Sequence, residues 1–241
     1  MKVKDIGSRG VLFTFYELDG YPTNVYVIRG DHHTFVCDTF LGPDCMEEVT
    51  YHMRYHYRET PYIIFNSHYH WDHVWGNCAF ESAPILAHTL CRELMKEKGR
   101  RELDEHEEYE AGDVELILPS VTFTERIEFC DERVEFFYSP GHTEDSASCF
   151  DRKDKILFVG DNVEVPIPYL FSKDLRAYEE TLENYLATEY DRVILGHGSS
   201  PGRSVIQENL EYIRAFLQGD TGKYEQNPYG TIHRMNVELQ K

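Results

Sequence analysis

The alternation of apolar and polar positions along the chain predicts a mixture of strands and helices. Short runs rich in β-branched and aromatic residues are separated by turn pairs such as Asp19-Gly20 and Gly30-Asp31, a pattern typical of strands. The strands predicted in this way cover residues 11–16, 23–29, 34–38, 62–66, 121–124, 134–139, 147–151, 156–160 and 193–196.

Helices are predicted for residues 43–57, 89–98, 174–188 and 205–217. The last of these follows Ser204, with Gln207 three residues later, a capping-box pattern that predicts a helix start at Ser204. The charged stretch 100–113 is typical of a solvated loop or helix face. The order of elements indicates an α/β protein with two packed β-layers and helices outside.

Composition is that of a folded protein. With 241 residues, 41% of them hydrophobic, the chain can bury a sizeable core, and no repeat or linker interrupts it, so we expect one domain over residues 1–241. No apolar run approaches the ~20 residues of a membrane span, and no secretory signal is evident, so we expect a cytoplasmic protein. Six scattered cysteines without a C-x-x-C pair favour buried free thiols over a disulfide framework.

The formal net charge of −19 limits the classes of partner. Such a field repels phosphate backbones and anionic lipid, which disfavours nucleic acid and membrane surfaces. We therefore expect a small-molecule substrate. The sequence does not indicate an oligomeric state.

Four side chains capable of binding metal occupy six consecutive positions just after the predicted strand 62–66: His68, His70, Asp72 and His73. In extended backbone, residues two apart point to the same side, so His68 and His70 can present both imidazoles to one ion. Asp72 and His73 stand where the backbone is expected to turn, which lets them face a second ion. Since imidazole and carboxylate suit zinc and similar metals, this density predicts a metal site rather than core packing.

Three more candidates follow predicted strands and stand next to glycine: His142, Asp161 and His197. Glycine allows the backbone to turn sharply there, and catalytic groups often gather on strand-end loops. Taken singly, each residue has an ordinary structural explanation; together with the cluster, they favour ligands that close the site. The remaining seven histidines lack these features, and surface or core roles are expected for them: His32, His33, His52, His56, His88, His106 and His233.

The order His68-x-His70-x-Asp72-His73, then His142, Asp161 and His197, resembles the metallo-β-lactamase superfamily. The similarity extends from Thr23-Asn24-Val25-Tyr26 to Gly196-His197-Gly198. The resemblance implies a four-layer αβ/βα sandwich, in which two mixed β-sheets pack face to face, helices cover the outer faces and metals lie at one edge.

The resemblance also implies how the ligands divide between two ions. The ligands of the first ion would be His68, His70 and His142. The ligands of the second would be Asp72, His73 and His197. Asp161 would bridge the two ions. Members often carry an aspartate where Asp38 stands, which implies that Asp38 orients a ligand histidine.

The same comparison bears on the branch of the superfamily. The antibiotic-cleaving β-lactamases do not use a bridging aspartate at this position, so Asp161 indicates the branches of glyoxalase II, the lactonases and related hydrolases. The family's usual Pro-Gly-Ser-like turn after Pro-Gly-His-Thr is replaced here by Glu144-Asp145-Ser146-Ala147. The subfamily therefore stays open.

These expectations converge on a metal-dependent hydrolase. A hydroxide bound by two divalent ions, expected to be zinc with iron or manganese as alternatives, would cleave an ester, thioester or lactone bond in a small molecule. Asp72 is the expected catalytic residue, because it can contact both the second metal and the hydroxide. Tyr69, Trp71, Trp75 and the segment 166–171 could either line an apolar substrate pocket or pack in the core.

Three other functions are weighed against this one. An iron-dependent, dioxygenase-like oxidoreductase on the same scaffold is the leading alternative, since histidine and carboxylate sets also hold non-haem iron. Phosphodiester cleavage is disfavoured by the acidic field. A purely structural metal module is disfavoured because an aspartate-bridged pair leaves room for water.

Overall fold

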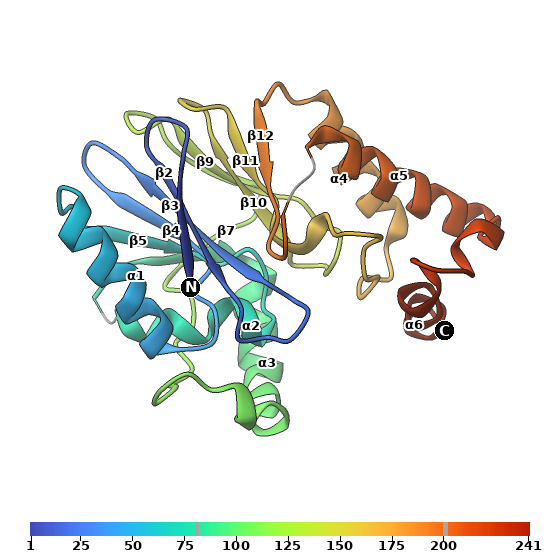
Figure 1. Ribbon diagram of the computed structural model, residues 1–241, viewed down its shortest axis with the longest axis horizontal. Coiled ribbons are helices and arrows are strands. Elements are labelled where there is room, and N and C mark those ends of the chain that lie inside the picture. Colours follow the sequence, from blue (N-terminus) through green and yellow to red (C-terminus); the bar gives the residue numbers. More distant parts are fainter. Residues whose placement is uncertain (81, 200–201) are drawn as a thin grey trace.

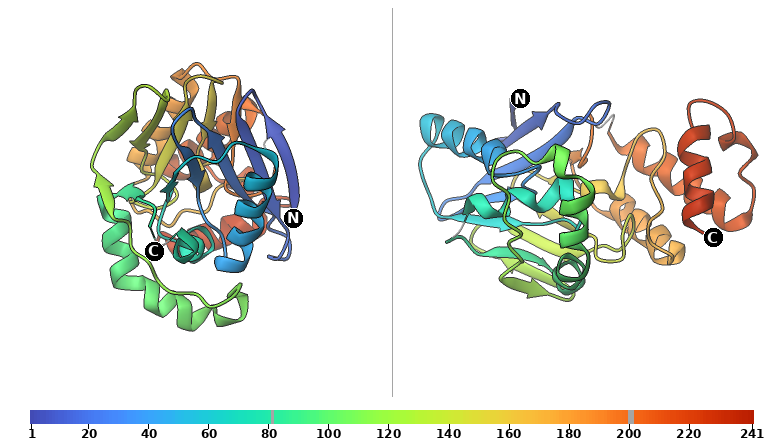
Figure 2. Two further views of the ribbon diagram at one scale, coloured as in Figure 1. Left: turned by 90° about the vertical axis from the view of Figure 1, so that its left-hand side faces the viewer. Right: turned by 90° about the horizontal axis from the view of Figure 1, so that it is seen from below.

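Two mixed β-sheets pack face to face, and helices cover both outer faces of the sandwich (Figures 1 and 2). The structure is a computed structural model that describes residues 1–80, 82–199 and 202–241. It confirms the αβ/βα sandwich that the sequence predicted.

The first sheet has seven strands in sequence order, antiparallel from β1 to β4 and parallel from β4 to β7. Its central strands are buried on both faces, which explains why they read as apolar runs without alternation. The strands are β1 (Lys2–Ile6), β2 (Gly10–Phe15), β3 (Thr23–Arg29), β4 (Thr34–Cys37), β5 (Tyr62–Phe65), β6 (Ile85–His88) and β7 (Val121–Phe123).

The second sheet has five strands in the order β12-β11-β10-β9-β8, all antiparallel except the parallel pair β11 and β12. The strands are β8 (Arg126–Phe129), β9 (Val134–Tyr138), β10 (Ala147–Asp151), β11 (Ile156–Phe158) and β12 (Arg192–Ile194). Between the sheets, the ring of Phe136 lies 4.6 Å from that of Phe65 and 5.8 Å from that of Phe35, centroid to centroid, so aromatic packing joins the two layers.

Helices close the outer faces of both sheets. Met46, Val49 and Met53 of α1 pack on the first sheet, and α4 and α5 pack on the second. The helices are α1 (Pro43–His56), α2 (Trp71–Val74), α3 (Thr89–Glu105), α4 (Leu175–Ala187), α5 (Arg203–Gln218) and α6 (Gly230–Leu239). The described residues also form four 3-10 turns: η1 (Trp75–Phe80), η2 (Glu107–Tyr109), η3 (Gly160–Asn162) and η4 (Gly222–Tyr224).

Each predicted strand and helix is present, with ends that differ by a few residues except at α3. That helix continues to Glu105, so part of the charged stretch 100–113 is helical. The predicted capping box was wrong, because α5 begins at Arg203 after Gly202 and has no side-chain capping bond. Five elements were not predicted from the sequence: β1, β6, β8, α2 and α6.

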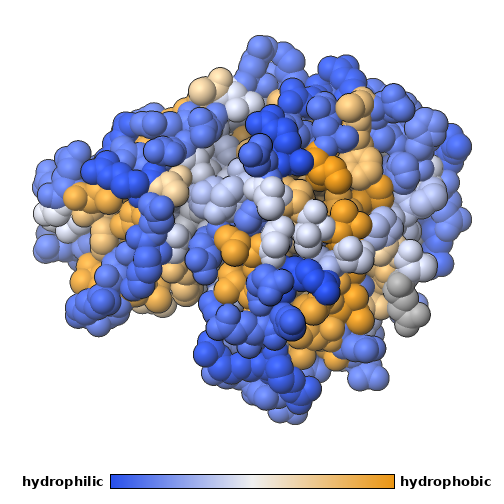
Figure 3. Space-filling view, turned by 180° about the vertical axis from the view of Figure 1, so that it is seen from behind, coloured by the Kyte–Doolittle hydropathy of each residue, from blue (hydrophilic) through white to orange (hydrophobic). Residues whose placement is uncertain are grey.

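Figure 3 shows patches of apolar side chains set among hydrophilic ones on the face opposite to that of Figure 1. All six cysteines are free thiols. Four of them are buried as expected, but Cys78 is only partly buried and Cys130 is exposed. None of the helices formed by the described residues combines the length and apolar character that a membrane crossing requires.

A buried ion pair links the two sheets at the end away from helix α6. The Arg9 guanidinium, in the turn between β1 and β2, donates from Nη2 to Asp151 Oδ1 at 2.5 Å and from Nε to Asp151 Oδ2 at 3.1 Å. Asp151 is fully buried at the end of β10. A paired arrangement of this kind offsets the cost of removing both charges from water.

We expect Arg9→Met to lower the free energy of unfolding by about 3–5 kcal/mol, because it leaves the Asp151 carboxylate buried without its cation. Urea unfolding followed by circular dichroism measures this change. As a control, Arg100→Met removes an exposed pair with Asp104 and should cost at most about 1 kcal/mol. If the two variants lost equal stability, the buried pair would not be the link between the sheets. The double variant Arg9→Met/Asp151→Leu should recover part of the loss.

Candidate metal centre

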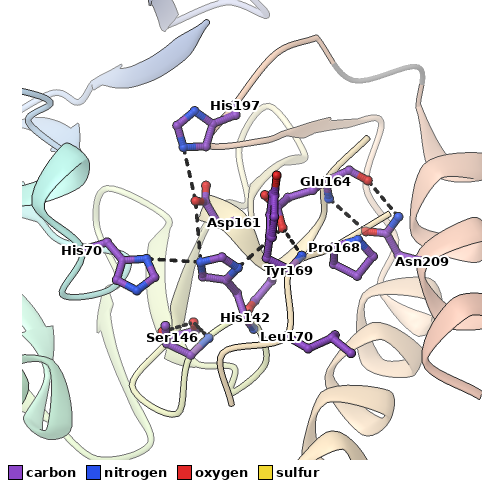
Figure 4. Close-up of polar contacts among 12 residues, drawn as sticks. His70, His142, Ser146, Asp161, Glu164, Pro168, Tyr169, Leu170, His197 and Asn209 are labelled. Carbon is purple, nitrogen blue, oxygen red and sulfur yellow. Dashed lines mark hydrogen bonds and ion pairs between the residues drawn. The ribbon is translucent and has the colours of Figure 1, made fainter. Parts of the chain in front are cut away.

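The seven predicted ligands come from loops at the ends of four strands, one in the first sheet and three in the second. His68 and His70 follow β5, and Asp72 and His73 lie in the short helix α2. The remaining three follow β9, β11 and β12: His142, Asp161 and His197. The structure brings all seven together at one edge of the sandwich, and Figure 4 shows four of them in detail.

His68, His70 and His142 form the first group of converging nitrogens. His70 Nδ1 lies 3.0 Å from His68 Nε2 and 3.2 Å from His142 Nε2. Ligands bonded to zinc at about 2.0–2.1 Å in a tetrahedron are about 3.3 Å apart. The spacing of the three nitrogens therefore fits one ion.

Asp72, His73 and His197 form the second group. His197 Nε2 lies 3.2 Å from Asp72 Oδ2 and 3.3 Å from His73 Nε2. Asp72 Oδ2 and His73 Nε2 are 3.7 Å apart. These distances also fit one ion, and the two groups correspond to the division that the family resemblance implied.

Asp161 stands between the two groups. Its Oδ2 lies 3.2 Å from His73 Nε2 and 3.3 Å from His197 Nε2 in the second group. The same oxygen lies 3.9 Å from the Nε2 atoms of both His68 and His142 in the first group. Its other oxygen, Oδ1, is buried and has no hydrogen-bond partner among the described residues, which fits a group that awaits a cation.

Gly196 makes room for this carboxylate. A Cβ atom at residue 196 would collide with Asp161 Oδ1 and approach His73 Cε1. The glycine beside His197 is thus required by the close approach of backbone to the metal centre rather than by a turn alone.

Three of the predicted ligand histidines are oriented through the ring nitrogen that faces away from the centre. Asp38 Oδ2 lies 2.8 Å from His73 Nδ1 and also accepts a bond from Ser67 Oγ. Ser67 Oγ lies 3.0 Å from His68 Nδ1, and Thr23 Oγ1 lies 3.1 Å from His197 Nδ1. Asp38 therefore has the position that the resemblance implied, while Ser67 and Thr23 were not predicted.

Burial and neighbouring charges shift the pKa values of these histidines in opposite directions. Burial and the adjacent His142 lower the pKa of His70 to about 3. Burial also opposes protonation of His197, but the carboxylates of Asp161 and Asp72 outweigh it and raise its pKa to about 10. Burial is similarly outweighed at His73, whose pKa is raised by Asp161 and Asp72. Without metal, the second group therefore holds protons that a cation would replace.

The donor set thus fits two divalent ions. Five imidazoles and two carboxylates converge, and Asp161 Oδ2 lies between the two groups. His68, His70 and His142 would hold one ion, the second group would hold the other, and Asp161 would contact both. The assignment of each side chain as a ligand stays a prediction.

Some of the aromatic residues considered as pocket lining pack in the core, and others are exposed near the site. Tyr69 and Trp75 are buried in a core cluster with α3, so they pack rather than line the site. Phe171 is 43% exposed, and its ring lies 5.0 Å from the rings of both His70 and His142. Phe171 is therefore the member of this set best placed to meet a substrate.

Comparison with known proteins decides the family. The family model described as the metallo-β-lactamase superfamily matches residues 18–197 and so spans from the loop before β3 to the last predicted ligand. The chain belongs to the metallo-β-lactamase superfamily. As a member, it has the scaffold of a metal-dependent hydrolase, with a candidate metal site of histidines and aspartates.

The chain is also similar to a fungal protein. The chain is 25% identical over 195 residues to a protein of Aspergillus versicolor named "Putative transcription factor avaE". The match covers 70% of this chain and 57% of that relative, so the chain spans little more than half the relative's length.

Solved structures of metallo-β-lactamases share the fold. The metallo-β-lactamase from Pontibacter korlensis superposes with a TM-score of 0.72 at 20% identity, covering 88% of this chain and 98% of that one. The DIM-1 metallo-β-lactamase superposes with a TM-score of 0.71 at 21% identity, covering 89% of this chain and 97% of that one. TMB-1 superposes with a TM-score of 0.70 at 18% identity, covering 90% of this chain and 98% of that one. At this level of identity the similarity extends to the fold alone.

We expect metal binding at this superfamily site to release protons and to tighten as pH rises. A histidine must be neutral to bind metal. The pKa of His197 is raised to about 10 and that of His73 is also raised, so protons compete with the ion at neutral pH. Each displaced proton should improve affinity roughly tenfold per pH unit. Calorimetry in buffers of different ionisation enthalpy, with chelator competition between about pH 6 and 9, measures both effects. An affinity that is constant over this range would contradict the protonation pattern.

Proposed function

We propose that this protein is a dinuclear metal hydrolase, with zinc as the native metal, that cleaves an ester, thioester or lactone bond in a small molecule. We place it with the branches of glyoxalase II and the lactonases rather than with the antibiotic-cleaving β-lactamases. The observation that carries the proposal is the position of Asp161 Oδ2, within 3.9 Å of four histidine nitrogens from both ligand groups.

A shared carboxylate favours two ions held close together over one isolated ion. Two divalent ions held by these residues would lower the pKa of a bound water and act as Lewis acids toward the carbonyl group of a substrate. The chain's own residues provide the rest of the chemistry. Asp161 and the five imidazoles fix the geometry of the centre, and Asp38, Ser67 and Thr23 keep three of the rings in place.

Asp72 has a further role in this proposal. Its side chain is 14% exposed, whereas those of His68, His73 and His142 are at most 3% exposed, so it faces the mouth of the site. The adjacent His73 and His197 hold the pKa of Asp72 at about 2 against the effect of burial. The carboxylate is therefore ionised at neutral pH and can accept a hydrogen bond from the attacking hydroxide, which orients the nucleophile.

Aromatic side chains surround the approach to the site and support a substrate with an apolar part. Phe171 borders the first group, and Tyr21, which is 47% exposed, has its ring 6.1 Å from that of His197 in the second group. The hydroxyl groups of Tyr21 and Tyr169 are 2.8 Å apart and connect these two sides. An ester or lactone with an apolar acyl group would bury this aromatic surface on binding.

The name of the fungal relative refers to transcription, but a nucleic acid is a poor partner for the present chain. A net charge of −19 opposes the approach of a phosphate backbone. The proposed partner is a small molecule.

The proposal is tested by metal analysis and a substrate panel. Protein purified without added metal should contain about two divalent ions per chain, and it should hydrolyse at least one of a set of ester, thioester and lactone substrates. We expect activity to increase with the apolar character of the acyl group. Iron at both sites, combined with oxygen consumption and no hydrolysis, would favour the oxidoreductase alternative and reject the proposal.

We expect Asp72→Asn to remain slow when both metal sites are filled. An amide has one acceptor oxygen and no charge, so it cannot hold a metal and accept the hydrogen bond of the hydroxide as well as a carboxylate does. The turnover number, measured at saturating zinc with metal content checked in parallel, should fall about 10²–10⁴-fold. Asp104→Asn, an exposed aspartate on α3, is the matched control and should keep full activity. Near wild-type turnover of fully metallated Asp72→Asn would remove Asp72 from catalysis.

A further inference from the structure

His142 is a predicted ligand histidine whose outward nitrogen is buried without a hydrogen bond among the described residues. Three of the others use this nitrogen to contact Ser67, Asp38 or Thr23. His142 Nδ1 is buried and has no hydrogen-bond partner among the described residues. The oxygen that lies beside it, at 3.5 Å, is Oε2 of Glu164 (Figure 4).

Glu164 is held firmly in this place from two directions. Its Oε2 accepts a bond from the backbone nitrogen of Tyr169 at 2.7 Å. Its main chain is bonded on both sides by the amide of Asn209 in α5: Glu164 N donates to Asn209 Oδ1 at 2.9 Å, and Asn209 Nδ2 donates to Glu164 O at 2.8 Å. Glu164 is 8% exposed and Asn209 is fully buried, so water cannot readily replace these bonds.

The segment that starts at Glu164 also encloses the backbone of His142. The nitrogens of Phe171 and Ser172 both donate to the carbonyl oxygen of His142, at 3.1 and 3.0 Å. Asn236 of α6 fixes the middle of this segment, because its amide bonds to Leu170 N at 3.0 Å and to Pro168 O at 2.7 Å. Helices α5 and α6 therefore position the segment that carries Glu164.

A carboxylate at this position determines which nitrogen of His142 is available to a metal. With Nδ1–H directed at Glu164, the lone pair of the neutral ring lies on Nε2. Nε2 is the atom that faces His70 Nδ1, at 3.2 Å, and Asp161 Oδ2, at 3.9 Å. The carboxylate also increases the basicity of the ring as a ligand.

Direct coordination of metal by Glu164 is the rival explanation, since Glu164, His142 and Asp161 offer ligand atoms within 4.8 Å of one another. The two nitrogens of an imidazole point away from each other, however, and Glu164 Oε2 lies on the Nδ1 side. That oxygen is already bonded to Tyr169 N. This arrangement favours contact with the ring over contact with the ion.

We propose that Glu164 is a positioning residue that orients His142 and fixes its tautomer for the first metal, and that Asn209 of α5 holds Glu164 in place. The inference rests on the metal centre of the proposed function and is independent of the substrate.

The experiment compares Glu164→Gln with Glu180→Gln, which makes the same chemical change on the exposed side of α4. Zinc affinity is measured by chelator competition, and the ligand environment by the visible spectrum of the cobalt-substituted protein. We expect Glu164→Gln to bind two ions with about 10–100-fold weaker affinity at one site and an altered cobalt spectrum. Glu180→Gln should match the wild type in both measurements.

The role of Asn209 is tested in the same way. Asn209→Ala should weaken the same site, but its effect should be much smaller when Glu164→Gln is already present, because the two residues act through one contact. Circular dichroism identifies any variant that fails to fold, and Glu164→Gln alone then decides the inference.

Two results would overturn the proposal. Wild-type affinity and an unchanged cobalt spectrum in Glu164→Gln would show that the carboxylate does not act on His142. Complete loss of one ion at saturating metal would make Glu164 a ligand instead. If the wild-type protein bound no metal, the proposed function itself would fail, which separates that outcome from a failure of Glu164 alone.

Discussion

The structure depends on how it accommodates the buried carboxylate of Asp161. An ionised carboxylate away from water is costly unless opposite charge or hydrogen bonds compensate for it. Asp161 has imidazoles on several sides, and His73 and His197 hold its pKa well below the usual range although burial acts in the opposite direction. The residues that provide this compensation come from strand ends in both sheets. The two sheets must therefore pack together for the charge of Asp161 to be compensated.

The sequence was sufficient for the parts of the site that depend on local spacing. His68, His70, Asp72 and His73 stand close together in the chain, and each of the other three predicted ligands follows an apolar run and a glycine. Glu164, Ser67 and Thr23 carry no comparable signal, because a serine, threonine or glutamate in a loop has many possible partners. Their contacts with His142, His68 and His197 arise from tertiary packing, which spacing along the chain does not encode.

The missed elements of the fold have a similar explanation. Helix α6 buries Gly230, His233 and Asn236, so its packed face is polar and lacks the apolar periodicity that marks a helix. Strand β8, Arg126–Phe129, is a short edge strand with no fully buried residue. The predicted capping box at Ser204 failed because a two-residue match to a motif is weak where the backbone before it turns through Gly202, at φ 103°.

The space left by Gly196 has a consequence for how such a protein can change over time. Any larger residue at 196 would displace Asp161, so this point of the scaffold tolerates almost no variation. The aromatic residues at the mouth are under no such restriction, because Tyr21 and Phe171 project from loops into solvent. Side chains at the mouth can therefore be exchanged while the candidate metal centre stays the same. A scaffold with an invariant floor and variable loops around the mouth of its site can accommodate many different ligands.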